Sequence, residues 1–233
     1  MRQIQRVAQE DFGIDILQIT ETAGRSTARL ALAMLEGRGK GQRVVVLAGG
    51  GNLGAVGLAA VRNMANWGLV VEPVFGEVEN DMSVLARKQV QILRSAGIVE
   101  PVDQATSEMT IEDHLTRADL VIDALLGYGH EGPATGIAAA LVNLALESKR
   151  PVLSIDVPTG VSAISGEAFP PAIRAMTTLL LDLPKKGVIE PAARPFVGEC
   201  YLADVGIPLR AYDRFGVNCH GLFTEGPIVH LKR

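Results

Sequence analysis

The sequence GGGNLGAVG occupies residues 49–57 of this chain of 233 residues. A short apolar run precedes it at residues 44–48, and a run with helical character follows at residues 58–67. A strand, a glycine-rich loop and a helix in this order can form a site for a phosphate-bearing ligand, because glycine allows close approach and the first turn of a helix has free N–H groups. Asn52 is the only polar side chain in residues 49–57, so we expect a binding loop with little polar chemistry of its own.

Short apolar runs and helix-like runs alternate on both sides of this loop. We expect strands at residues 44–48, 69–75, 98–102, 119–126, 151–155, 177–181 and 198–203. We expect helices at residues 1–38, 58–67, 82–96 with Asp81 as the cap, 111–117 and 134–148. Pro73 cannot donate a ladder hydrogen bond, which places the second strand near a sheet edge. The alternation predicts an α/β fold in which helices cover both faces of a mostly parallel sheet.

No internal repeat or low-complexity linker interrupts this pattern, so we expect a single domain over residues 1–233. N-terminal helices would occupy residues 1–40, the α/β core residues 41–208, and a C-terminal tail residues 209–233. Hydrophobic residues make up 48% of the chain and charged residues 21%, which is typical of a globular protein with a buried core.

The overall charge gives no reason to expect a polyanionic partner. The formal net charge is −4 and the pI about 5.6, which disfavours binding to nucleic acid or to anionic membranes. The N-terminus lacks the apolar core of a signal peptide, and no apolar run reaches the ~20 residues of a membrane span. We therefore expect a cytoplasmic protein. Cys200 and Cys219 form no CxxC pair, so free thiols are favoured over a disulfide or a zinc site.

Ligands of doubly wound sheets bind beyond the carboxyl ends of the strands. This rule selects three loops, at residues 49–56, 123–133 and 156–165. Asp123 ends an apolar strand and needs a partner, which can be a cation, a ligand hydroxyl or local amides. Asp156 directly follows another apolar strand and suits proton transfer, with an ordinary turn as the simpler alternative. His130 and Lys185 can contact a ligand, Lys185 by offsetting phosphate charge, or can lie in solvated turns.

The first loop also matches the pattern G-x-G-x-x-G, at Gly49, Gly51 and Gly54, which belongs to the fingerprint of dinucleotide-binding proteins. A full fingerprint has an acidic residue about 20 positions later, at the end of the second strand. Glu72 lies within that expected strand and Glu77 beyond it. This pattern is consistent both with a dinucleotide site of the dehydrogenase type and with a simple tight turn between a strand and a helix.

Five further motifs follow one another along the chain. They are TAGRSTA at residues 22–28, VIDALLGYG at 121–129, SIDVPTG at 154–160, LPKKG at 183–187 and ADVGIP at 203–208. As an ordered set they resemble the YjeF N-terminal domain family, the NAD(P)H-hydrate epimerases, over about residues 8–208. Thr22 in the first motif stands where that family has asparagine.

The resemblance implies a three-layer Rossmann-like fold, a homodimer, and an isomerase that interconverts the R and S forms of hydrated NADH or NADPH (NADHX and NADPHX). Such an enzyme repairs a damaged nucleotide, which is its substrate rather than its cofactor. Asp156 is the implied catalytic acid and base. The implied substrate-binding residues are Asn52, Gly54, Gly127, Tyr128, Gly129, His130, Glu131, Gly132, Pro133 and Lys185. The implied ligands of a potassium ion are Asp123 and Thr159.

The glycine loop departs from the family pattern Gly-x-Gly-Asn-Asn-Gly-Gly-Asp-Gly at three positions. Leu53 replaces an asparagine expected to bind potassium, Ala55 replaces a glycine, and Val56 replaces an aspartate expected to contact substrate. Each lost polar contact should weaken binding by ~1–3 kcal/mol. We therefore expect an epimerase with altered metal dependence. The alternative is a catalytically degenerate nucleotide-binding or regulatory module of the same fold.

Overall fold

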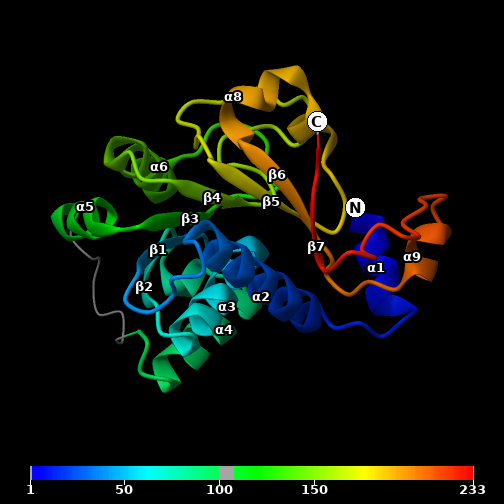
Figure 1. Cartoon of the computed structure of the whole chain (residues 1–233), viewed down its shortest axis with the longest axis horizontal. Coiled ribbons are helices and arrows are strands. Elements are labelled where there is room, and N and C mark those ends of the chain that lie inside the picture. Colours follow the sequence, from blue (N-terminus) through cyan, green and yellow to red (C-terminus); the bar gives the residue numbers. More distant parts are fainter. Residues whose placement is uncertain (1, 100–107, 233) are drawn as a thin grey trace.

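The computed structural model describes residues 2–99 and 108–232, in which seven strands form one sheet (Figure 1). The strands are β1 (Arg43–Ala48), β2 (Val70–Phe75), β3 (Leu120–Ala124), β4 (Val152–Ile155), β5 (Thr177–Leu181), β6 (Glu199–Ala203) and β7 (Ile228–His230). Their order is β2-β1-β3-β4-β5-β6-β7, and every neighbouring pair is parallel except β6 with β7. The predicted α/β fold with a mostly parallel sheet is confirmed.

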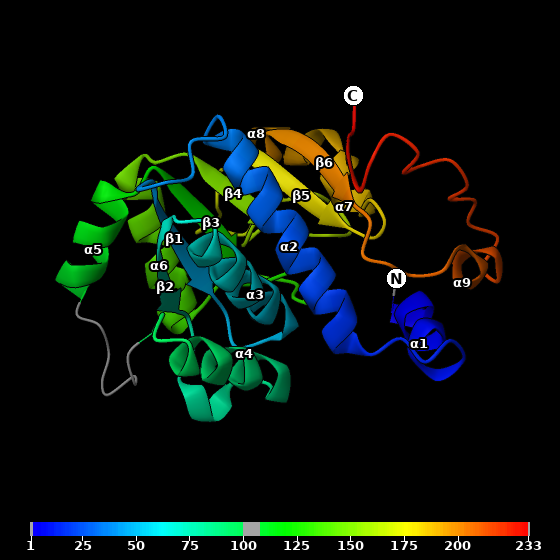
Figure 2. The ribbon, with the colours of Figure 1, turned by 60° about the horizontal axis from the view of Figure 1, so that its bottom comes forward.

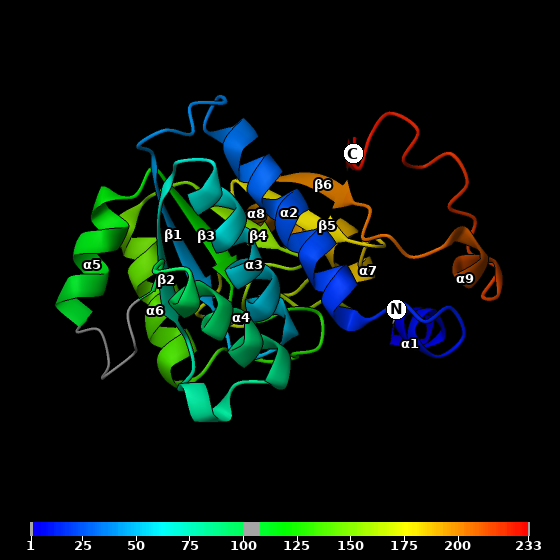
Figure 3. The same ribbon diagram turned by 90° about the horizontal axis from the view of Figure 1, so that it is seen from below.

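Helices lie on both faces of this sheet, which gives three layers (Figures 2 and 3). The longer helices are α1 (Arg2–Glu10), α2 (Ile16–Met34), α3 (Asn52–Asn66), α4 (Val84–Ser95), α5 (Glu108–Arg117) and α6 (Gly136–Ser148). The shorter ones are α7 (Lys186–Ile189), α8 (Arg194–Val197), α9 (Leu209–Asp213) and the 3₁₀ turns Glu79–Asp81 and Pro191–Ala193. Helices α2, α3 and α4 cover one face, and α5 and α6 the other.

The side chains of β1 explain why its sequence is a continuous apolar run. Val44 and Val46 pack in the hydrophobic cluster that includes the buried faces of α2 and α3. Val45 and Leu47 point to the opposite face and pack in the cluster formed with α5 and α6. A strand that is buried on both faces needs apolar residues at every position, rather than at alternate ones.

Helices α2 and α3 approach each other closely at Gly24, the glycine of the TAGRSTA motif. A Cβ atom on Gly24 would lie 2.6 Å from the Cβ of Ala59 and 3.0 Å from the carbonyl oxygen of Val56. The glycine therefore serves helix packing, and it holds α2 against the helix that follows the glycine loop.

Several predicted elements differ from the structure. The helix expected at residues 1–38 is two helices, α1 and α2, separated by residues 11–15, and the strand expected at residues 119–126 is β3 (Leu120–Ala124). Helix α3 begins at Asn52 rather than at residue 58, with extended Gly51 as its N-cap, so the polar part of the glycine loop is the first turn of a helix. Helix α4 is capped by the hydroxyl of Ser83, which accepts a hydrogen bond from the Ala86 amide at 3.1 Å, and not by Asp81. The strand expected at residues 98–102 is not formed at residues 98–99, and residues 100–102 lie outside the described part.

The C-terminal tail returns to the core at two places. Strand β7 pairs with β6, with Val229 opposite Leu202, and extends the sheet by one antiparallel strand. Helix α9 lies beside α1 (Figures 2 and 3). Cys200 and Cys219 are buried, and neither forms a disulfide among the described residues. Within the described residues, no helix combines the length and the apolar character needed to cross a membrane.

Candidate functional site

A cavity of about 970 Å³ opens beyond the carboxyl ends of the parallel strands. Residues that follow β1, β2, β3, β4 and β5 directly line it, namely Gly49, Gly76, Leu125, Asp156 and Asp182. Side chains of α2 and Gln5 of α1 complete the wall. The sheet order changes direction between β1 and β3, and the cavity therefore lies where ligands of doubly wound sheets bind.

The glycines of residues 49–57 hold the loop against the end of β3. The Gly49 amide donates a hydrogen bond to the carbonyl of Ala124 at 3.0 Å. A Cβ atom on Gly49 would overlap the Leu125 carbonyl, and one on Gly54 would overlap the Gly49 carbonyl. Gly54 is buried and does not line the cavity, whereas Asn52 does. These two glycines therefore have structural reasons to be present that are independent of any phosphate.

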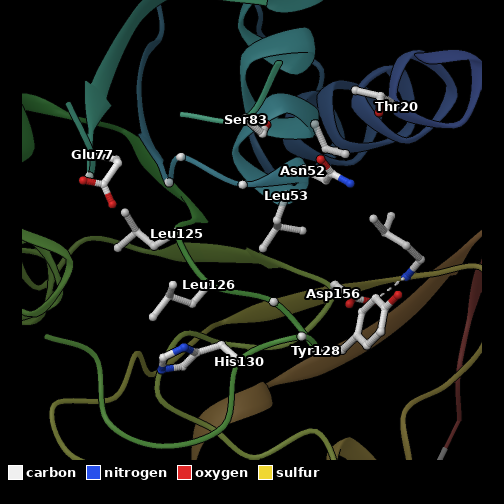
Figure 4. A pocket seen from close by; sticks show the side chains of 18 of the residues that line it. Thr20, Asn52, Leu53, Glu77, Ser83, Leu125, Leu126, Tyr128, His130 and Asp156 are labelled. Atoms are coloured by element: carbon white, nitrogen blue, oxygen red, sulfur yellow. Dashed lines mark hydrogen bonds between the residues drawn. The ribbon is translucent and has the colours of Figure 1, made fainter. Parts of the chain in front are cut away.

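Leu53 and Val56 form an apolar wall where the sequence pattern led us to look for polar ligands. Both line the cavity, and Val56 is 6% exposed. Leu53 lies over Gly127, where a Cβ atom would approach the Leu53 Cδ2 to 3.1 Å. Figure 4 shows Leu53 facing Leu126 across this part of the cavity. A ligand in the cavity therefore meets hydrocarbon on the side of α3.

Asp156 and Lys185 form a buried ion pair at the end of β4. The Lys185 Nζ pairs with the Asp156 Oδ1 and donates a hydrogen bond to the Leu181 carbonyl at 2.7 Å. The Leu181 amide donates to the same carboxylate oxygen at 3.3 Å. The Lys185 Nζ also lies 5.3 Å from the centre of the Tyr128 ring (Figure 4). Asp156 has a φ of +69°, a left-handed conformation that aspartate adopts more readily than most residues, and this turns its side chain into the cavity wall.

The Asp123 carboxylate is saturated by hydrogen bonds inside the protein. Its Oδ2 accepts from the Ser154 hydroxyl at 2.8 Å and the Thr159 amide at 2.9 Å. Its Oδ1 accepts from the Thr159 hydroxyl at 2.6 Å and the Leu125 amide at 3.3 Å. Burial raises the pKa of the Asp123 carboxyl above its usual value, and these hydrogen bonds oppose the shift. Neither Asp123 nor Thr159 lines the cavity, and no group of three His, Cys, Asp or Glu side chains able to hold a metal occurs among residues 2–99 and 108–232.

The loop after β3 contributes only its first half to the cavity. Gly127, Tyr128, Gly129 and His130 line it, whereas the expected substrate-binding residues Glu131, Gly132 and Pro133 do not. The chain turns away at this point, where the His130 Nε2 lies 3.3 Å from the Pro133 carbonyl oxygen. The Tyr128 hydroxyl donates to the Gln5 Oε1 at 3.0 Å and so ties this loop to α1.

The sequence profile described as YjeF-related protein N-terminus matches residues 17–187 of the chain. The chain belongs to the YjeF N-terminal family. An NAD(P)H-hydrate epimerase of Dehalogenimonas lykanthroporepellens is 38% identical over 234 residues, which cover 99% of this chain and 90% of that protein. One of Rhodopirellula baltica is 31% identical, with 93% of this chain and 86% of that protein covered. The bifunctional NAD(P)H-hydrate repair enzyme Nnr of Moorella thermoacetica is 32% identical over 89% of this chain and 39% of its own length.

The YjeF-type fold is also found in a solved structure. The crystal structure of yeast ynu0 superposes with a TM-score of 0.76 over 97% of this chain and 95% of that one. The sequence identity is 22%, so this likeness concerns the fold alone. The three-layer Rossmann-like fold that the resemblance implies is confirmed.

The polar residues of this YjeF-type site that were not found from the sequence include Asp182 and its partner Tyr212. Asp182 lines the cavity directly after β5, and the Tyr212 hydroxyl on α9 donates a hydrogen bond to its Oδ1. Burial raises the pKa of Asp182, and both burial and the Asp182 charge raise the pKa of Tyr212. An available signal was that Asp182 follows an apolar strand just as Asp156 does. Tyr212 lies beyond the segment that the family profile matches, and no periodicity marks it.

Proposed function

We propose that this chain is an NAD(P)H-hydrate epimerase, an isomerase of nucleotide repair that interconverts the R and S forms of NADHX and NADPHX. The Asp156–Lys185 pair carries the proposal, because it places a fixed carboxylate in the wall of a cavity of about 970 Å³. This volume is at the upper end of the range for small-molecule sites, as a dinucleotide requires. Family membership and epimerases at 38% and 31% identity support the same reaction.

Inversion requires the bond between the ring carbon and its hydroxyl to break and to form again on the other face. The lone pair of the ring nitrogen forms a C=N bond as the hydroxyl leaves with an added proton as water. Water then attacks the opposite face and loses a proton. Asp156 accepts that proton, and its negative charge stabilises the cationic intermediate. Lys185 holds the carboxylate in place.

The direct test follows the two epimers by chromatography after adding the protein to one purified epimer of NADHX. We expect the two epimers to interconvert much faster than they do spontaneously, at a rate proportional to the protein concentration. A rate equal to that of buffer alone, in both sodium and potassium salts, would overturn the proposed function.

The second candidate function is a nucleotide-binding or regulatory module without catalysis. The apolar wall of Leu53 and Val56 favours it, because neither side chain offers an oxygen to a ribose or an ion. Thermal unfolding that shifts upward with adenine nucleotides, in a protein that does not equilibrate NADHX, would identify this function. The dehydrogenase-type alternative requires redox turnover of NADH with a carbonyl compound.

We propose that internal hydrogen bonds take the place of a potassium ion in this chain. A carboxylate has about four lone-pair directions, and Asp123 uses four for Ser154, Thr159 and Leu125. Leu53 adds no oxygen ligand. Asp123, Thr159 and Leu53 therefore do not fit a bound potassium ion, and no step of the proposed reaction depends on one.

This leads to a prediction about salts. Both the epimerisation rate and the midpoint of thermal unfolding should be equal in potassium chloride and in choline chloride at the same ionic strength. Leu53→Asn restores one oxygen ligand and serves as the comparison variant. A rise in either quantity with potassium in the unaltered protein would contradict the prediction.

The charges around the cavity predict a preference for NADHX over NADPHX. Among the described residues that line it, Glu77, Asp81, Asp156 and Asp182 are acidic, and Lys185 is the only lysine or arginine. Glu77 follows β2 and lies against the glycine loop, since a Cβ atom on Gly50 would be 2.8 Å from the Glu77 Cγ. An acidic residue at this place accepts hydrogen bonds from a ribose 2′-hydroxyl and repels a 2′-phosphate.

We expect kcat/KM to be roughly tenfold higher for NADHX, which corresponds to ~1.4 kcal/mol. Glu77→Gln should narrow this ratio, whereas Glu147→Gln, on α6 outside the cavity, should not. Equal kcat/KM values for the two substrates in the unaltered protein would contradict the prediction.

The homodimer, the cytoplasmic location and the single-domain organisation stay predictions. Light scattering during size-exclusion chromatography tests the first, cell fractionation the second, and limited proteolysis the third. A monomer that epimerises NADHX would also show that one chain suffices for the site.

A further inference from the structure

Two carboxyl groups occupy equivalent positions on adjacent strands of the site. Asp156 directly follows β4 and Asp182 directly follows β5, and these strands are paired in parallel. Both residues have left-handed φ values, +69° and +70°, and both line the cavity. Asp156 is 2% exposed and Asp182 is 1% exposed, so both residues are almost fully buried.

The polar contacts of Asp182 leave one of its oxygens unused. The Tyr212 hydroxyl donates to the Asp182 Oδ1, whereas the buried Asp182 Oδ2 has no hydrogen-bond partner among the described residues. Lys185 contacts the Asp156 Oδ1 and the Leu181 carbonyl, and its Nζ makes no hydrogen bond to the Asp182 Oδ2. A buried polar atom without a partner is costly. Because Asp182 is a lining residue of the cavity, we infer that a ligand donor supplies this partner.

We propose that Asp182 is a second catalytic residue, the general acid that protonates the departing hydroxyl while Asp156 serves as the general base. This role rests on the proposed epimerase function. Tyr212 is a positioning residue, since it holds the Oδ1 and thereby directs the Oδ2.

The proton balance of this scheme closes. The proton of Asp182 moves to the hydroxyl as the carbon–oxygen bond breaks, and the nitrogen lone pair forms the C=N bond. Water adds to the other face, the C=N electrons return to nitrogen, and the proton of that water moves to Asp156. The reverse reaction uses Asp156 as acid and Asp182 as base, and between turnovers in one direction the proton returns through solvent.

The surroundings of the two carboxyls match these unequal roles. Burial raises the pKa of Asp182, the Asp156 charge adds to this rise, and the Tyr212 hydrogen bond and the Lys185 charge oppose it. Asp182 also faces the buried thiol of Cys219, whose own pKa is raised by burial and by the Asp182 charge. Asp156 instead contacts the Lys185 ammonium through its Oδ1. Neighbouring carboxyls in unlike environments divide acid and base roles in this way.

The first experiment compares Asp182→Asn with Asp204→Asn. Asp204 follows β6 as Asp182 follows β5, but it does not line the cavity, and its carboxylate accepts only the Gly206 amide at 2.8 Å among the described residues. We expect Asp182→Asn to lower kcat about 10²-fold or more with a smaller change in KM, since a general acid contributes to that extent. Asp204→Asn should keep the kcat of the unaltered protein.

The second experiment measures how the rate depends on pH. Asp182 must hold its proton, so the rate should fall as the pH rises past its raised pKa. Tyr212→Phe removes a hydrogen bond that lowers this pKa, and it should move the alkaline fall to higher pH. The matched control is Tyr201→Phe on β6, which removes a phenol hydroxyl outside the cavity. Carbon-13 NMR of labelled aspartates, assigned with Asp182→Asn, reports the same titration without turnover.

Three outcomes would overturn the proposal. These are a kcat for Asp182→Asn within about twofold of the unaltered protein, an alkaline fall that Tyr212→Phe leaves in place, or an Asp182 carboxyl that titrates in the usual aspartate range. The second outcome stays decisive if Asp182→Asn does not fold, because it needs only the Tyr212→Phe variant. An inactive unaltered protein would overturn the epimerase function itself, and this differs from an active protein in which Asp182→Asn changes nothing.

Discussion

Replacing Asp156 by asparagine is expected to lower kcat for epimerisation by roughly 10²–10⁴-fold, the usual contribution of a general base. The amide keeps the shape of the carboxylate but cannot accept the proton of the attacking water, and it removes the negative charge that stabilises the cation. It also leaves the Lys185 ammonium, whose side chain is 7% exposed, without its counter-charge. Loss of one partner of a buried ion pair costs ~3–5 kcal/mol, so kcat must be measured together with the free energy of unfolding.

The double variant Asp156→Asn, Lys185→Met separates chemistry from folding. Methionine keeps the apolar stem of lysine and removes the unpaired charge, so the free energy of unfolding should recover while kcat does not. Asp204→Asn controls for a change of charge near the carboxyl edge of the sheet. Activity of Asp156→Asn within severalfold of the unaltered protein would show that Asp156 is not the base.

Replacing Asp123 by alanine is expected to lower the free energy of unfolding by about 3 kcal/mol or more. The carboxylate is 1% exposed and accepts four hydrogen bonds, two of them from the backbone amides of Leu125 and Thr159. These amides cannot rotate to another acceptor, and each unsatisfied buried donor costs ~1–3 kcal/mol. Urea denaturation followed by circular dichroism measures the change.

Ser154→Ala is the matched control for this prediction. It removes one donor from the Asp123 Oδ2 and leaves the two amide hydrogen bonds in place, so a loss of ~1 kcal/mol is expected. If the free energy of unfolding of Asp123→Ala lies within ~1 kcal/mol of that of the unaltered protein, the hydrogen bonds to Asp123 contribute little to stability.

Much of the fold could be predicted from the sequence because buried parallel strands need unbroken apolar runs. Strand β5 agrees with its predicted bounds, and β1, β2, β4 and β6 agree to within one residue. The start of α3 could not be predicted, because residues 49–57 contain several glycines and the N-cap depends on the extended backbone of Gly51. The cap of α4 was missed for a similar reason, since Asp81 and Ser83 are both suitable residues for that place.

The candidate site could be predicted where one strand end supplies both position and chemistry. Asp156 and Lys185 were identified in this way, and the structure brings them together. The Tyr212 contact with Asp182 could not be predicted, because it joins the core to a segment without periodicity. Local amides were one of three partners considered for Asp123, but the choice among them depends on the geometry of the turn after β4 and not on the residue types alone.

The hydrogen bond from Tyr212 to Asp182 has a consequence for recombination. Helix α9 lies beyond residue 187, where the match to the family profile ends, yet it completes a residue of the cavity wall. A chimera that joins this core to a foreign tail without a hydroxyl at this position would inherit an aspartate with neither oxygen satisfied. The core and the tail therefore have to be kept together. We expect a chimera of two relatives to fold well only when strand β5 and helix α9 come from the same protein.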